Sequence, residues 1–274
     1  MKTAILVRGH ARTWSLTKQH NLQLMSSIYD SPDWFFGAPD SNTISNQSVQ
    51  TDFAGYNLIS TALLDEKTYP LPAHNDDVNR WRSWIPAYWR LAWLDYHLGM
   101  AKRRHELVTG IRYDNVLFLR TDCWYFQVGQ DNRATKLLHG MSVSHIGPNG
   151  AMGVDDWISD DLVWRAGAAA ADILCMRWFD THYDRHSTTQ LIHGHSHALL
   201  ASYVARNFIA HDPTADSFKC TLIRPDHADL MPWTWEKHDE THNDSFTWHG
   251  LAPAEKIKWC EKLGIDPRDY QLVD

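Results

Sequence analysis

The first clear structural signal in the chain is TAILVRGHART, residues 3–13. Residues 3–7 form a continuous apolar run bounded by charge, which is typical of a strand buried in the middle of a sheet. Leu22 and Met25 then recur on one helical face, and DWFFGAP (33–39) predicts a second strand. A strand, a helix and a strand within about forty residues indicate a βα unit of a parallel or mixed sheet.

The rest of the chain continues this alternation. The segment LISTALLD predicts another strand, a three-four spacing of apolar residues predicts a long amphipathic helix, and VLFL predicts a buried strand. The polar stretch before LISTALLD predicts an irregular, mobile surface loop. The expected elements are a loop at 41–57, strands at 58–65, 116–119 and 219–225, and helices at 84–108 and in ALLASYVARNF (198–208).

Composition limits the class of protein. The chain has 274 residues, 43% hydrophobic and 22% charged, which is ordinary for a globular domain. A net charge of −7 disfavours a nucleic-acid partner, and no apolar run reaches the roughly 18 residues of a transmembrane helix. The N-terminus shows no signal peptide, and the cysteines form no CxxC pair. These features predict a cytoplasmic protein without a transmembrane segment.

The loop that follows the first strand has features of a phosphate-binding turn. Gly9 lets the backbone approach an anion, and the following helix N-terminus supplies N–H groups. Arg8 and Arg12 can each hold phosphate oxygens through two hydrogen bonds, with His10 between them. The alternative is a tight turn with surface arginines. A histidine phosphatase, which this opening also suggests, needs the His directly after Arg, where Gly9 stands.

A second polar motif stands where the strand VLFL ends. Arg120, Thr121 and Asp122 follow it, and ligands of open α/β sheets bind at the carboxyl ends of strands. In an extended backbone, Arg120 and Asp122 point to the same side. A fixed guanidinium or a carboxylate-bound metal can neutralise a departing diphosphate. Asp122 offers the oxygen ligand that Mg²⁺ or Mn²⁺ prefers.

The remaining candidates are carboxylates and histidines in the second half of the chain. Asp155, Asp156, Asp160 and Asp161 form an acidic patch that could supply a general base near an acceptor hydroxyl, or a solvated turn. The segment HGHSH (193–197) could bind zinc, but it leads into a predicted helix that would splay the rings apart, and no carboxylate lies at ligand spacing.

These pieces together resemble a known group. Gly9-His10-Ala11-Arg12-Thr13 after a first strand, then Tyr113-Asp114 to Arg120-Thr121-Asp122, resemble the GT-A-type glycosyltransferases of viral genomes and polysaccharide loci. The stretch SDDLVWRAGAAAADILC and the closing TLIRP are similar to later parts of that group. The resemblance covers roughly residues 1–225. The chain departs from better-known GT-A enzymes in having Arg120 where the first Asp of Asp-x-Asp would stand.

The resemblance implies a fold, a reaction and a site. The fold is α/β, a GT-A-like nucleotide sandwich with a mostly parallel sheet flanked by helices, in residues 1–225. The His/Trp-rich extension at 226–274 has no counterpart in that group, and we expect it to pack on this domain. The reaction is transfer of a sugar from a nucleotide-diphosphate donor to a carbohydrate acceptor, as in polysaccharide biosynthesis. By the resemblance, Gly9 and Arg12 would contact the nucleotide, Asp122 would bind Mn²⁺ or Mg²⁺, and Asp160 and Asp161 are favoured over Asp155 and Asp156 as catalytic carboxylates. The residues themselves add Arg8, His10 and Arg120 as nucleotide-binding candidates and Asp156 as a catalytic candidate.

Two other functions stay open at this stage. One is phosphate-ester or phosphoryl-transfer chemistry that uses the Arg8–Arg12 loop. The other is a sugar- or nucleotide-binding module without catalysis, in which some of the 14 tryptophans stack on ligand rings.

Overall fold

The structure is a computed structural model. It describes residues 1–40, 44–65, 84–127, 137–144, 163–183, 203–204, 207–212, 218–224 and 229–231, together with residues 254 and 257. Among these residues, no helix is long and apolar enough to cross a bilayer.

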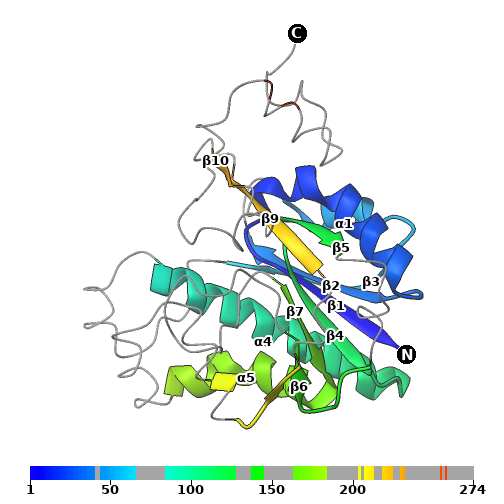
Figure 1. The fold of residues 1–274 in the computed structure, drawn as a ribbon, viewed down its shortest axis with the longest axis vertical. Helices are drawn as coiled ribbons and strands as arrows, with labels where there is room; N and C mark the ends of the chain where they lie inside the picture. The colour runs from blue at the N-terminus through cyan, green and yellow to red at the C-terminus, as the bar shows by residue number, and fades with distance from the viewer. Residues whose placement is uncertain are drawn as a thin grey trace.

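A seven-stranded sheet forms the centre of the fold, in the order β3-β2-β1-β4-β7-β6-β8 (Figure 1). Strands β3, β2, β1 and β4 are parallel, β7 is antiparallel to β4 and β6, and β8 is parallel to β6. The strands are β1 (Thr3–Arg8), β2 (Asp33–Pro39), β3 (Asn57–Leu64), β4 (Asn115–Arg120), β6 (Ser142–Val143), β7 (Val163–Gly167) and β8 (Ala210–His211). The predicted α/β class with a mostly parallel sheet is confirmed.

Helices cover both faces of the sheet (Figure 1). One face packs on α1 (Trp14–Ile28) and α2 (Asn46–Asp52), and the other packs on α4 (Trp84–Thr109) and α5 (Ala168–Tyr183). Because both faces are covered, the central strands need apolar side chains in both directions. Continuous apolar runs in the sequence satisfy that need.

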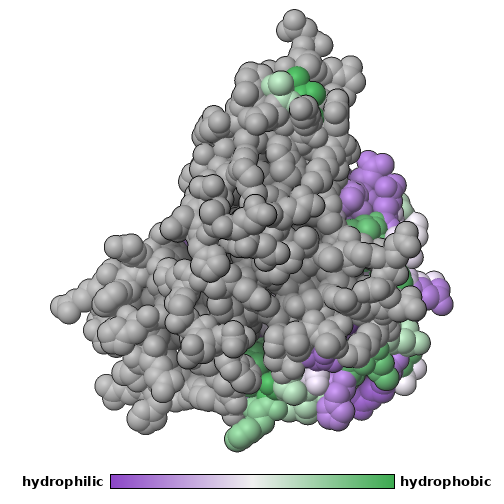
Figure 2. All heavy atoms as spheres, viewed as in Figure 1, coloured by the Kyte–Doolittle hydropathy of each residue, from purple (hydrophilic) through white to green (hydrophobic). Residues whose placement is uncertain are grey.

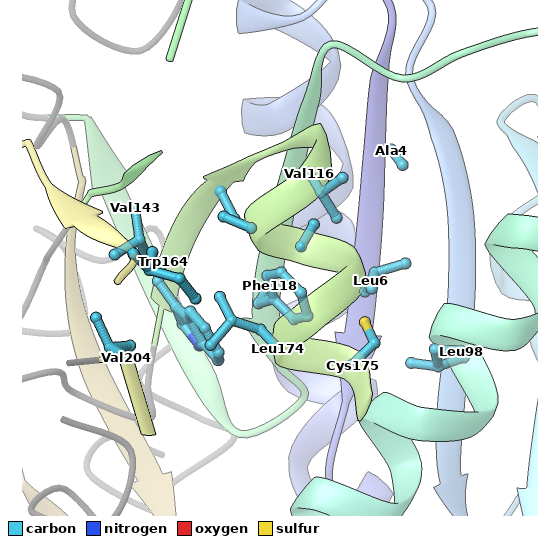
Figure 3. Close-up of a cluster of buried hydrophobic side chains, with 14 of the residues drawn as sticks. Ala4, Leu6, Leu98, Val116, Phe118, Val143, Trp164, Leu174, Cys175 and Val204 are labelled. Carbon is cyan, nitrogen blue, oxygen red and sulfur yellow. The ribbon is translucent and has the colours of Figure 1, made fainter. Parts of the chain in front are cut away.

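Strand β1 shows how one run serves both faces. Ala4 and Leu6 belong to the buried cluster under α4 and α5, whereas Ile5 and Val7 belong to the cluster under α1. Figure 3 shows the first cluster, in which Leu174 of α5 lies beside Phe118 and Trp164 of the sheet, and Leu98 of α4 lies on the side of Cys175. The rings of Phe118 and Trp164 stack with centroids 4.5 Å apart. The core therefore continues from β1 through β4 to β7.

A second, three-stranded sheet lies beside α1 (Figure 1). It consists of β5 (Cys123–Gln127), β9 (Phe218–Arg224) and β10 (Asp229–Met231), and β9 is antiparallel to both neighbours. Strand β5 follows β4 after a turn of two residues, so this sheet begins next to the RTD motif. Strand β10 belongs to the predicted extension 226–274, and the division of the chain at residue 225 stays a prediction.

Most of the predicted elements that fall in described residues are confirmed. The strand 33–39 has the predicted bounds, and the predicted helix 84–108 is Trp84–Thr109. It ends where Gly110, at a φ of 72°, donates its N–H to the carbonyl of Glu106 over 2.9 Å. Of the predicted helix 198–208, the structure describes only 203–204 and 207–208.

The prediction of an irregular loop across 41–57 is wrong in its middle, where α2 forms. Ser45 begins this helix with a capping box, because its hydroxyl accepts from the Ser48 N–H and its own N–H donates to the Ser48 hydroxyl. Val49 is the buried residue of the helix, which is too short to show a periodic apolar face. The capping pair Ser45 and Ser48 was therefore a sequence signal for this helix, although the polar composition of the stretch suggested a loop.

The surface of the described residues is mixed. Figure 2 shows hydrophilic and apolar residues interspersed along the edge of the visible face where the described residues lie. Leu107 and Val108, near the end of α4, are among the exposed apolar side chains. Exposed apolar residues of this kind are normal on globular proteins.

A cluster of buried charges lies between the sheet and the helices α4 and α5. Asp95 of α4 pairs through one carboxylate oxygen with Arg8 Nε, 2.6 Å away, and through the other with Arg177 of α5. All three side chains are at most 1% exposed. Both guanidinium groups also lie over the ring of Trp164, at 5.6 and 5.5 Å from its centroid. The Asp95 carboxylate of α4 therefore connects this helix to the end of β1 and to α5.

We expect Asp95→Asn to lower the free energy of unfolding by about 3–5 kcal/mol, because two buried guanidiniums would lose their shared counter-charge. Urea denaturation of the purified chain measures this change. The matched control is Asp172→Asn, since Asp172 is 41% exposed and pairs with Lys102 at 2.9 Å. Lys102 is buried but keeps Glu106 as a second partner at 3.1 Å, so we expect this substitution to cost only about 1 kcal/mol. Equal effects of the two substitutions would contradict a structural role for the buried cluster.

Candidate functional site

The order of the strands marks one edge of the sheet as the place for a ligand. From β1 the chain moves outward to β2 and β3, and the next parallel strand, β4, lies on the other side of β1. In open α/β sheets, ligands bind outside the carboxyl ends of the strands at such a reversal. The segments that leave β1 and β4 here are the RGHART loop and the RTD motif.

Hydrogen bonds join these two segments directly. The Thr121 N–H donates to the Arg8 carbonyl over 3.0 Å, and the Thr121 hydroxyl donates to the His10 carbonyl over 2.5 Å. Gly9 donates its N–H to the Gly37 carbonyl of β2 over 3.2 Å. The three strand ends therefore hold one another in place.

Gly9 fits a position that other residues would strain. Its φ is +125°, and a Cβ atom built on it would lie 3.0 Å from Thr121 Oγ1. The glycine thus permits both the unusual backbone angle and the close approach of the β4 end. The predicted importance of Gly9 for backbone geometry agrees with this conformation, while its contact with a nucleotide stays a prediction.

The first helix begins next to this loop. A 3-10 turn, η1 (Ala11–Thr13), leads into α1, and neither a side-chain cap at Thr13 nor an acidic residue in the first turn is present. The positive end of the helix dipole is therefore not neutralised within its own first turn. The Arg12 backbone lies in η1, and its side chain lies outside the described part of the structure.

Arg120 and Asp122 form a bidentate ion pair. Arg120 Nε and Nη2 donate to the two carboxylate oxygens of Asp122, each over 2.8 Å. The Tyr125 hydroxyl accepts from the Arg120 N–H over 2.6 Å and lies 3.2 Å from the Arg120 carbonyl. The pairing does not come from an extended backbone, because Thr121 and Asp122 form a turn before β5 begins.

Polar residues of α1 hold that turn from the other side. The Thr17 hydroxyl donates to the Thr121 carbonyl over 2.8 Å. Asn21, which is buried, donates to the Cys123 carbonyl over 2.8 Å and accepts from the Tyr125 N–H over 3.3 Å. His20 Nε2 lies 2.7 Å from the Tyr125 carbonyl, and burial lowers the pKa of this histidine. Helix α1 thus fixes the backbone between β4 and β5.

The opposite edge of the sheet carries a different kind of polar cluster. Asp33, at the start of β2, is buried and accepts from Lys2 Nζ at 2.8 Å, from Asn57 Nδ2 at 2.6 Å and from the Tyr113 hydroxyl at 2.7 Å. Burial, together with this carboxylate, raises the pKa of Tyr113. Three donors from different segments satisfy one carboxylate, which is an arrangement that fastens the amino ends of the strands.

The structure separates the sequence candidates into three groups. Gly9, His10, Arg120 and Asp122 lie together at the carboxyl edge of β1 and β4, with His10 half-buried. Arg8 is fully buried in its ion pair with Asp95. Outside the described residues lie Asp155, Asp156, Asp160, Asp161, His193, His195 and His197. Their roles, and the predicted nucleotide contacts of Arg8 and Arg12, stay predictions.

The residues near Asp122 do not fit a divalent metal in this conformation. Within the described part of the chain, no group of three His, Cys, Asp or Glu side chains is placed to hold an ion. More directly, both oxygens of Asp122 accept from the Arg120 guanidinium. A dication bound at those oxygens would lie beside a like charge, which opposes its binding. Among the described residues, Asp122 is therefore an anchor for an arginine.

Sequence reasoning missed several residues that build this edge. Thr17, Asn21 and Tyr125 act through backbone contacts that span about a hundred positions, and no local pattern marks such contacts. Asp95 carried a detectable signal, because it is a lone carboxylate within the aromatic stripe LAWLDYHLG. A charged residue on an apolar helix face requires a buried partner.

No protein-family model matches this chain, and no curated protein matches it. Several solved structures whose chain follows a similar path are glycosyltransferases. One is described as involved in glycosylation of the major capsid of PBCV-1, at 12% identity, with 95% of this chain and 99% of that chain covered and a TM-score of 0.39. The galactosyltransferase LgtC, solved with donor and acceptor sugar analogues, has 11% identity, coverage of 76% and 72%, and a TM-score of 0.42. Mouse xyloside xylosyltransferase 1 has 10% identity, coverage of 76% and 82%, and a TM-score of 0.37. Similarities this distant assign no activity.

We expect Gly9→Ala to lower the free energy of unfolding by about 1–3 kcal/mol, because alanine is strained at this φ and its methyl group would press on Thr121. The matched control is Gly55→Ala, where φ is +88° and nothing lies within 4 Å of the added atom. Both variants place an alanine at a positive φ, but only Gly9→Ala adds a contact with Thr121. The difference between their free energies of unfolding, measured by chemical denaturation, is therefore the cost of that contact. Equal losses would contradict the close approach of the two loops.

Proposed function

We propose that this chain is a glycosyltransferase that transfers a sugar from a nucleotide-diphosphate donor to a carbohydrate acceptor. The observation that carries the proposal is the hydrogen bond between Thr121 and His10, 111 positions apart, at the reversal of strand order. It joins the two motifs that sequence analysis selected independently for anion binding. They meet at the edge where α/β sheets bind nucleotides.

The chemistry of that edge suits a departing diphosphate. Sugar transfer from such a donor leaves negative charge on the β-phosphate oxygen, and preorganised N–H donors or cations stabilise it. Gly9 brings the backbone close, η1 and α1 place a helix N-terminus beside the loop, and Arg120 adds a guanidinium. Each of these groups is already held in position by the contacts described above.

The acceptor side of the reaction rests on the sequence. A general base would take the proton of the acceptor hydroxyl, and Asp156, Asp160 and Asp161 are the candidates that the chain offers. They precede β7, which is the antiparallel neighbour of β4 in the sheet. The proposal includes them as catalytic carboxylates.

Nucleotide binding and sugar release together test the proposal. We expect one of UDP, GDP and dTDP to raise the melting temperature of the purified chain, because a ligand at 100 times its Kd stabilises the folded state by about 2.7 kcal/mol. The matching nucleotide-sugar should then release its nucleotide when carbohydrate acceptors are supplied. Gly9→Ala should weaken this stabilisation, and Gly55→Ala should leave it unchanged.

The other outcomes distinguish the alternative functions. Stabilisation by a nucleotide without sugar release on any acceptor would favour a binding module. Hydrolysis of an aryl phosphate would favour phosphate-ester chemistry. If no nucleotide stabilises the chain, the proposal is wrong.

A further inference from the structure

We infer that Arg120 is the cation that binds the donor diphosphate and that Asp122 is its positioning residue, in place of a metal ligand. This inference rests on the proposed function and specifies how the same site neutralises its anionic ligand. The sequence places Arg120 where the first carboxylate of an Asp-x-Asp motif would stand, and the structure shows what that exchange does to Asp122.

The two hydrogen bonds between the side chains fix the plane of the guanidinium. Nε and Nη2 both lie 2.8 Å from carboxylate oxygens, and the side chains are only 16% and 9% exposed. A bidentate pair of this kind orients an arginine more strictly than a single contact does. Because the orientation is set before a ligand arrives, less conformational entropy is lost on binding.

The backbone of Arg120 is also fixed. Its N–H donates to the Tyr125 hydroxyl, while Tyr125 is held by Asn21 and His20 of α1. Both the main chain and the guanidinium of this residue are therefore immobilised from separate elements. That is the support expected around a group that must meet a ligand in one geometry.

Arg8 and Arg120 are neighbours in the sheet, but they differ in how far their side chains are exposed. Arg120 is the in-register partner of Arg8 on the neighbouring strand, so the two side chains leave the same face of the sheet. Like charges in such pairs repel, and here each has a carboxylate from a different element, Asp95 for Arg8 and Asp122 for Arg120. The Arg8 side chain is fully buried, whereas 16% of Arg120 is exposed. Arg120 is thus the accessible member.

The same geometry opposes a metal at Asp122. A carboxylate that ligates a dication directs its oxygens at the ion, but these oxygens face a guanidinium 2.8 Å away. If this ion pair opened, the positive charge of Arg120 would lose its carboxylate partner while it lies next to Arg8. A guanidinium carries five donors and is always charged, so it can bind phosphate oxygens without an ion.

Calorimetric titration of the full chain with UDP, GDP and dTDP and with their monophosphates tests the inference, in EDTA and again in Mn²⁺. We expect the wild type to bind one diphosphate with similar affinity in both buffers. Arg120→Gln should lower the affinity for that diphosphate by about ten- to a hundredfold, which is the range for a lost hydrogen bond to a charged group. The monophosphate should be affected much less, which a purely structural defect would not produce.

A double-mutant comparison tests the positioning role. If Asp122 acts through Arg120, Asp122→Asn should lower the affinity for the diphosphate. The double variant Arg120→Gln/Asp122→Asn should then bind the diphosphate no worse than Arg120→Gln alone. Arg120→Lys keeps the charge but loses the fork, so it should fold and bind with intermediate affinity. Arg104→Gln, at an exposed position on α4, is the matched control and should bind as the wild type does.

Two results would overturn the inference, and they differ from each other. Diphosphate binding that requires Mn²⁺, is lost in Asp122→Asn and persists in Arg120→Gln would make Asp122 a metal ligand while leaving the proposed function intact. Binding of no nucleotide at all would remove both the inference and the proposed function.

Discussion

The parallel pairing of β1 with β4 determines where the charged groups at the carboxyl edge of the sheet must lie. It runs in register from Thr3 and Asn115 to Arg8 and Arg120, and it joins strands that the sequence separates by a long excursion. The pairing places two arginines side by side at the carboxyl edge. Since like charges there repel, the fold must supply a carboxylate for each. Asp95 and Asp122 meet this requirement in two different ways.

The two arginines differ in their surroundings, which suit Arg8 to a structural role and Arg120 to ligand binding. Arg8 is enclosed with Asp95, Arg177 and the ring of Trp164, and this cluster fastens α4 and α5 to the sheet. Buried ion pairs contribute little net stability compared with apolar packing, but they make the loss of one partner costly. Arg120 lies one strand away, partly exposed, with its backbone and side chain both anchored. A rigid, accessible cation beside a glycine loop is suited to an anionic ligand.

Local sequence patterns predicted the parts of the fold that depend on local physics. The continuous apolar runs TAILV and VLFL predict central strands because only strands covered on both faces need them. The long helix follows from its spacing, and its end follows from Gly110. Strands β5 and β7 were missed, since CWYFQ and VWRAG are short and mix polar with apolar residues, and their pairing partners are distant in the chain.

The candidate site shows the same limit. The RGHART and RTD motifs could be recognised because glycine, arginine and aspartate after buried strands have few structural uses. That they meet follows from the order of strands, which a sequence pattern does not show. The ion pair of Asp122 is a further example: the residue type alone predicts a metal ligand, whereas the inference that Asp122 positions Arg120 depends on a guanidinium contact that only the structure shows.

The most direct test of this account is a crystal structure of the chain with the nucleoside diphosphate that stabilises it. We expect the diphosphate at the carboxyl ends of β1 and β4, with its oxygens within hydrogen-bonding distance of the backbone of the RGHART loop and of the Arg120 guanidinium. A nucleotide bound elsewhere, for example at the amino ends of the strands near Asp33, would contradict it.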